Sequence, residues 1–174
     1  MTNNMWNLAI DDGILGNLTP PDEIIALQCK RLGKITDGKI IAKVAPFRGQ
    51  KNTPYQDYDE YQPPDNIFEY EFYITSTFTP NYKYSVMFIN HTIEYYPLTL
   101  DIDSDIAGEI GISEVSYDSG LPRTIVEDEE KFTSTLSQII NTKKMKKVIN
   151  SLYSMIKSHE RKNHISFGED DLPF

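Results

Sequence analysis

The spacing of apolar residues predicts two kinds of regular segment along this chain. From about residue 20 to residue 33 apolar side chains recur every three or four positions, which is the period of an amphipathic helix. Thr19 is a suitable N-cap for this helix, and Gly33 a suitable stop. A second helix is predicted over residues 127–140, and a further helical stretch follows Thr142, which can cap it.

Other segments alternate between apolar and polar or aromatic residues with the period of two that is typical of β-strands. The predicted strands are residues 40–44, 67–78, 82–89 and 93–100. The last three are joined by short turns and therefore predict an antiparallel meander. A long polar loop with four prolines is expected over 46–66, and the acidic connection over 101–122 has room for a short strand at 110–115.

These elements predict an α+β fold, an antiparallel meander sheet with helices packed on one face. We expect one domain over residues 1–158, followed by a C-terminal tail, 159–174, that runs from basic to acidic. The expected core draws on both helical faces and on the sheet: Ile24, Leu27, Leu32, Phe72, Ile74, Phe132, Leu136, Ile149 and Leu152.

The segment from Pro21 to Val44 resembles the start of a group of small uncharacterised bacterial proteins. The spacing that carries this resemblance is Ile24, Gln28, Leu32-Gly33, Thr36, Gly38 and Val44. The resemblance covers about the N-terminal quarter of the chain and implies no activity.

Composition narrows the class of protein. The 174 residues are 39% hydrophobic, which is enough for a core in a chain of this size. With a formal net charge of −9, the chain as a whole should be repelled by nucleic acid and by anionic membrane, so a nucleic-acid contact requires a local basic patch. The single cysteine, Cys29, excludes an internal disulfide, and no apolar stretch approaches a membrane helix. We therefore expect a cytoplasmic protein, in a bacterium or another cell, with no membrane partner.

Several patterns of acidic residues resemble metal sites only in part. Asp101, Asp103 and Asp105 have the opening spacing of a calcium loop, but Ile106 and Ile112 stand where the loop needs Gly and Glu. We therefore expect a solvated acidic turn.

The pair Asp22 and Asp37-Gly38-Lys39 matches the outline of a metal-dependent nuclease, but that motif needs both acids on adjacent strands. Cys29 has no histidine near it in the sequence and is expected to be a packed side chain. No catalytic residue, metal ligand or cofactor is assigned, and the protein is not expected to be an enzyme.

A basic segment stands out in this acidic chain. Between Lys143 and His164 there are seven Lys and Arg residues against one acid, Glu160. The patch is densest at Lys143, Lys144, Lys146 and Lys147. Two interpretations stay open: a solvated helix face, or a surface that binds phosphate or an acidic peptide.

The last five residues, Asp170-Asp171-Leu172-Pro173-Phe174, form the most specific motif of the chain. They resemble the acidic tip of bacterial single-stranded-DNA-binding proteins, which that family uses to recruit enzymes of replication, repair and recombination. The residues themselves suit docking. Phe174 offers a ring beside a carboxylate, Pro173 stiffens the backbone before it and so lowers the entropy lost on binding, and the two aspartates complement a basic rim around an apolar pocket. The family's body is an OB barrel with a long linker, which these predicted elements do not match, so the resemblance transfers docking and not DNA binding.

Two functions follow from these observations. The leading hypothesis is a non-catalytic accessory or regulatory binding protein whose tail docks on a DNA-metabolism enzyme. The alternative is a divergent single-stranded-DNA-binding protein whose sheet aromatics stack on bases; a metal-dependent nuclease ranks third. Exposed aromatics beside basic residues on the meander would favour the alternative, and a closed apolar core there would favour the first.

Overall fold

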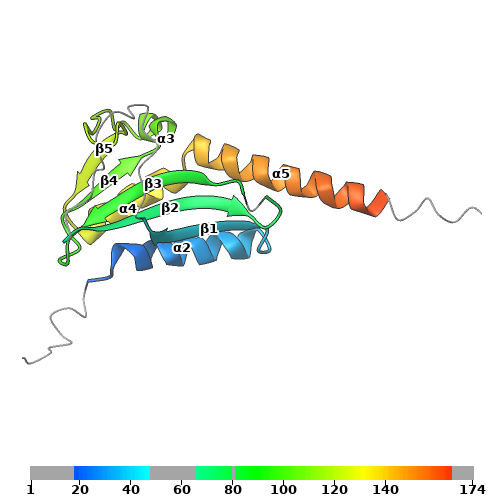
Figure 1. The fold of residues 1–174 in the computed structure, drawn as a ribbon, viewed down its shortest axis with the longest axis horizontal. Coiled ribbons are helices and arrows are strands. Elements are labelled where there is room, and N and C mark those ends of the chain that lie inside the picture. Colours follow the sequence, from blue (N-terminus) through cyan, green and yellow to red (C-terminus); the bar gives the residue numbers. More distant parts are fainter. Residues whose placement is uncertain (1–17, 48–65, 80, 166–174) are drawn as a thin grey trace, which may run out of the picture.

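The computed structural model describes residues 18–47, 66–79 and 81–165, and side chains as far as Lys162 (Figure 1). The helices are α2 (Pro21–Ile35), α3 (Ser104–Glu109), α4 (Glu129–Ile140) and α5 (Lys143–Ile165). The strands are β1 (Ile40–Pro46), β2 (Phe68–Ser76), β3 (Tyr84–His91), β4 (Leu98–Ile102) and β5 (Arg123–Val126). The predicted α+β class is confirmed.

The strands form one five-stranded antiparallel sheet in the order β1-β2-β3-β4-β5, so that every strand pairs with its neighbour in the sequence. The expected meander of three strands is thus extended by β1 on one edge and by β5 on the other. A β-bulge interrupts the β2–β3 register at Phe72/Tyr73, and such bulges increase the local twist of a sheet.

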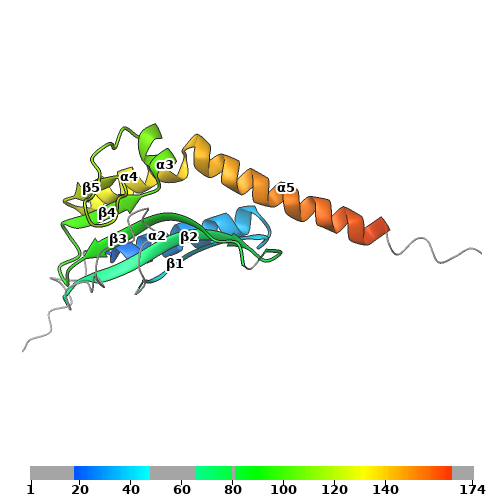
Figure 2. The same cartoon turned by 45° about the horizontal axis from the view of Figure 1, so that its top comes forward.

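Helices α2 and α4 lie against the same face of this sheet (Figure 2). Their buried side chains, Ile25 from α2 and Phe132, Leu136 and Ile139 from α4, join one core cluster with inward residues of all five strands. Helix α5 contributes Met145, Leu152 and Ile156 to the same core.

The predicted core is mostly confirmed, with one error on α2. Phe72, Ile74, Phe132, Leu136 and Leu152 are buried, and Ile24, Leu32 and Ile149 pack against the core while partly exposed. Leu27, however, is 50% exposed, whereas Ile25 is fully buried. Two residues along a helix correspond to a rotation of about 200°, so the face centred on Ile25 necessarily turns Leu27 outward.

Several predicted boundaries also differ from the structure. The strand expected over 93–100 begins only at Leu98, because Tyr95, with a positive φ of 66°, interrupts the extended backbone. The strand expected over 110–115 is absent; Val115 makes one isolated bridge, to Pro122. Thr19 is not the cap of α2, since its N–H donates to the Glu129 carboxylate (3.0 Å) and Pro20 occupies the cap position.

Candidate functional site

The four lysines of the predicted basic patch lie in the first turns of α5, whose N-terminal end is held by hydrogen bonds to Thr142 and Glu109. The Thr142 hydroxyl accepts a hydrogen bond from the Met145 N–H (3.3 Å), which confirms Thr142 as a cap. The N–H groups of Lys143 and Lys144 donate to the carboxylate of Glu109, at 2.7 and 2.8 Å. Glu109 ends α3, so a negative charge from α3 occupies the positive end of the α5 dipole.

The four lysines differ in their surroundings. Lys144 forms an ion pair with Asp105 and lies over the ring of Tyr84, 5.8 Å from its centroid. The hydrogen bond with Lys144 lowers the pKa of Asp105 and raises that of the lysine. Lys143, Lys146 and Lys147 are exposed, and among the described residues their ammonium groups form no ion pair within 4.0 Å. Lys144 therefore anchors α5 to α3, and the other three present their charges to solvent.

The second half of α5 carries three more exposed cations, Lys157, Arg161 and Lys162. Together with Tyr153, Ser154 and Ser158 they line a shallow hollow on the outside of the helix. The ammonium groups of Lys39 and Lys157 lie over the Tyr153 ring, 5.8 and 5.5 Å from its centroid. This hollow therefore combines positive charge, hydroxyl groups and an aromatic ring.

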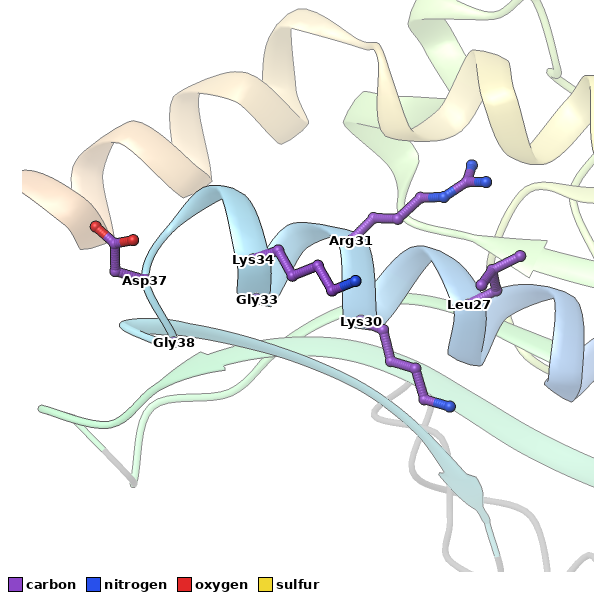
Figure 3. A pocket seen from close by; sticks show the side chains of 7 residues that line it. All are labelled: Leu27, Lys30, Arg31, Gly33, Lys34, Asp37 and Gly38. Atoms are coloured by element: carbon purple, nitrogen blue, oxygen red, sulfur yellow. The ribbon is translucent and has the colours of Figure 1, made fainter.

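A second shallow hollow lies on the outside of α2 and in the turn that follows it (Figure 3). Its lining includes Lys30, Arg31 and Lys34, with the exposed side chain of Leu27 at one end and the turn of Asp37 and Gly38 at the other. These cations were not among the residues predicted to form a site. The signal was present, because residues 30–39 hold four Lys or Arg and one acid.

The three aspartates with calcium-loop spacing each have a separate structural role. Asp101 is fully buried in an ion pair with Arg123, Asp103 caps α3 by accepting the N–H groups of Asp105 and Ile106, and Asp105 pairs with Lys144. Across the described residues no group of three or more His, Cys, Asp or Glu side chains is arranged to hold a metal ion.

The fold also separates the two acids of the nuclease-like pattern, Asp22 and Asp37. Asp22 lies in the first turn of α2, and Asp37 lies beyond its C-terminal end. The 15 residues of this helix span about 22 Å, so the two carboxylates cannot share one metal ion.

The described histidines have separate surroundings. His91 is buried against the rings of Phe68 and Tyr70. His159, on α5, contacts the ring of Phe78.

Cys29 packs against the core, and burial raises the pKa of its thiol to about 11. Only the thiolate attacks disulfide reagents, so at pH 8 we expect Cys29 to react about 100-fold more slowly than free cysteine. Because the thiolate fraction rises with pH until the pKa is passed, the labelling rate of Cys29 should keep rising up to about pH 11. Stopped-flow labelling of the native chain measures this, and a rate equal to that of free cysteine would contradict the burial.

The docking motif Asp170–Phe174 lies outside the described residues, as does part of the expected tail. Helix α5 itself continues to Ile165, so residues 159–165 of that tail are helical. Its last core residue is Ile156, and the remaining turns project beyond the sheet (Figure 1). The described part of the chain has no helix long and apolar enough to cross a membrane.

Comparison of the chain with protein-family models, with curated proteins and with solved structures gives no match.

Proposed function

We propose that this chain is a non-catalytic accessory or regulatory binding protein whose segment Asp170-Asp171-Leu172-Pro173-Phe174 docks on an enzyme of DNA metabolism. The observation that carries the proposal is the motif itself, in which two acids precede Leu-Pro-Phe. Such a segment suits an apolar pocket with a basic rim, because the ring supplies buried area and the carboxylates supply charge complementarity.

The geometry of α5 supports this proposal. Beyond Ile156, none of the described side chains up to Lys162 is buried, yet the helix continues to Ile165. Nine residues of helix correspond to about 13 Å. In the sequence the motif starts five positions after this helix, whose described turns beyond Ile156 contact the rest of the fold at its edge, through His159 with Phe78 and Glu160 with Lys39.

The sheet favours docking over the alternative of base stacking. Inward residues of the meander form a closed apolar core, and the outward face carries Glu71, Phe88, Asp101 and Arg123 side by side on four strands. Phe88 is only 7% exposed. Lys83 pairs with Glu71 (2.7 Å) and Arg123 with Asp101, so both cations are engaged with acids. On the described part of this face Tyr73 does lie beside cations: it is half-buried, pairs with the exposed Lys43 of β1, and has the Lys83 ammonium 5.1 Å from its ring centroid. This ring alone falls short of the successive exposed aromatics on which a run of bases stacks.

The proposal predicts an order among substitutions in the tail. Phe174→Ala should weaken binding to the partner more than Asp170→Asn, because burying the ring contributes about 1.5–3 kcal/mol, whereas each exposed charge contributes about 0–1 kcal/mol. Raised salt should weaken only the charge contribution. Fluorescence titration of peptides covering residues 166–174 against helicases and exonucleases that read single-strand-binding tails measures all three effects.

A pull-down with the full chain supplies the control. Tyr117 is 90% exposed on another part of the surface, so Tyr117→Ala removes a solvent-facing ring without touching the tail and should leave partner capture unchanged. Deleting Phe174 should abolish capture. If no peptide binds any of these enzymes at low salt, the docking proposal is wrong.

A further inference from the structure

The charges of this protein are strongly segregated. Of the 17 Lys and Arg residues, 11 lie in residues 30–39 and 143–162, and these two stretches contain only two of the 26 acids, Asp37 and Glu160. Eleven positive against two negative charges give these stretches +9, while six against 24 give the rest of the chain −18. Although the whole chain has a net charge of −9, residues 30–39 and 143–162 together are therefore strongly basic.

The fold brings the two basic stretches together. Lys39, just before β1, forms an ion pair with Glu160 of α5 (2.8 Å) and lies over the ring of Tyr153 in the same helix. Phe78, next to the end of β2, contacts the ring of His159, with centroids 4.2 Å apart. The start of β1 and the end of β2 thus lie next to the second half of α5.

Most of the α5 cations occupy the side of the helix that is turned away from the core. We define the basic face as the six exposed cations of α5: Lys143, Lys146, Lys147, Lys157, Arg161 and Lys162. The opposite side of the helix holds the buried residues Met145, Leu152 and Ile156. From Lys143 to Lys162 the helix rises about 28 Å, so the basic face is a long row of charges and not a single anion site.

We propose that the basic face of α5 binds the phosphate backbone of nucleic acid. A duplex presents one phosphate charge per about 1.7 Å of its axis, so a row of this length can meet several phosphates at once. The groups available are ammonium, guanidinium and the hydroxyls of Ser154 and Ser158, which contact phosphate and do not read bases. Binding is therefore independent of sequence and strongly dependent on salt.

An acidic peptide fits the basic face less well. A peptide that ends in an aromatic residue needs an enclosed apolar pocket for its ring, whereas the two hollows here are shallow and lined largely by charged and polar side chains. The surplus of acids in the rest of the sequence repels phosphate and so favours contact through the basic face. This surface does not include the docking motif Asp170–Phe174, so the two proposals stand or fall separately.

Fluorescence anisotropy of the full chain with a labelled 20-nucleotide strand, and with its duplex, tests the proposal between 25 and 200 mM salt. We expect binding at low salt that weakens steeply as salt rises. The variant Lys146→Glu/Lys147→Glu should bind at least about ten-fold more weakly and lower the slope of log K against log salt by about 2. Phe174→Ala should bind nucleic acid like the parent chain.

The matched control is Lys43→Glu/Lys131→Glu. Both lysines are exposed, on β1 and α4, and the double reversal changes the net charge from −9 to −13 as the test variant does. The control should bind within about two-fold of the parent chain, and equal melting temperatures exclude unfolding as the cause of a loss. The proposal is overturned if the parent chain binds no nucleic acid at 25 mM salt, if the control loses as much as the test variant, or if only an acidic peptide binds.

Discussion

Replacing Arg123 by methionine should lower the free energy of unfolding by about 3–5 kcal/mol. The reason is its partner, Asp101, whose side chain is fully buried on β4. Arg123 donates two hydrogen bonds to this carboxylate, from Nε at 2.5 Å and from Nη2 at 2.9 Å. Methionine keeps most of the side-chain volume but leaves a buried carboxylate without its counter-charge, which is the costly half of breaking a buried ion pair.

Urea unfolding of three variants separates the ion pair from mere loss of packing. The double variant Asp101→Asn/Arg123→Met should recover much of the lost stability, because asparagine carries no charge that needs compensation. As a matched control, Lys131→Met removes a cation from an exposed pair with Glu127 and should cost less than about 1 kcal/mol. If Arg123→Met costs no more than this control, Asp101 does not depend on Arg123.

The aspartates at 101, 103 and 105 illustrate why the partners of charged side chains could not be predicted from their spacing in the sequence. Asp101 pairs with Arg123, which is 22 residues further along the chain, and Asp105 pairs with Lys144, which is 39 residues further. Only Asp103 acts locally, by capping the helix that follows it. The spacing favoured a solvated acidic turn over a calcium loop, but the counter-charges of Asp101 and Asp105 come from pairing of β4 with β5 and from packing of α3 on α5.

The fold was predictable where the local signal is long and periodic. Amphipathic spacing predicted α2 and α4, and alternation predicted β1, β2 and β3 with small errors at their ends. The failures are short elements. β5 has four residues and begins with a charged one, and its stability comes from pairing with β4, which no local pattern reports. Helix α3 has six residues and depends on its cap at Asp103.

The basic surface was predictable in part for the same reason. A count along the chain found the lysines of α5, since they are close in sequence. It did not indicate that Lys144 is engaged by Asp105, nor that the residue before β1, Lys39, pairs with Glu160 of α5. Both facts depend on the order of helices and strands in space, and both change which cations are available to a ligand.

Truncating Leu136 to alanine should destabilise the protein by about 2–5 kcal/mol. Leu136 is 2% exposed on α4 and belongs to the core between the helices and the sheet. Its truncation removes apolar area from the core and leaves a cavity, and the final cost depends on how far the surrounding side chains can close that cavity. Alanine also favours helix, so helix propensity cannot account for a loss.

The same substitution at Leu27 supplies a matched control, because the two residues are chemically identical and both lie in amphipathic helices. Leu27 is 50% exposed, so Leu27→Ala should change the stability by no more than about 0.5 kcal/mol. Thermal and urea unfolding of both variants measure the difference directly. Equal losses would mean that α2 buries the face that carries Leu27, and an unchanged melting temperature for Leu136→Ala would mean that α4 does not pack on the sheet through Leu136. A large loss at Leu136 alone would show that burial against the sheet, and not the leucine itself, determines which face of each helix the fold depends on.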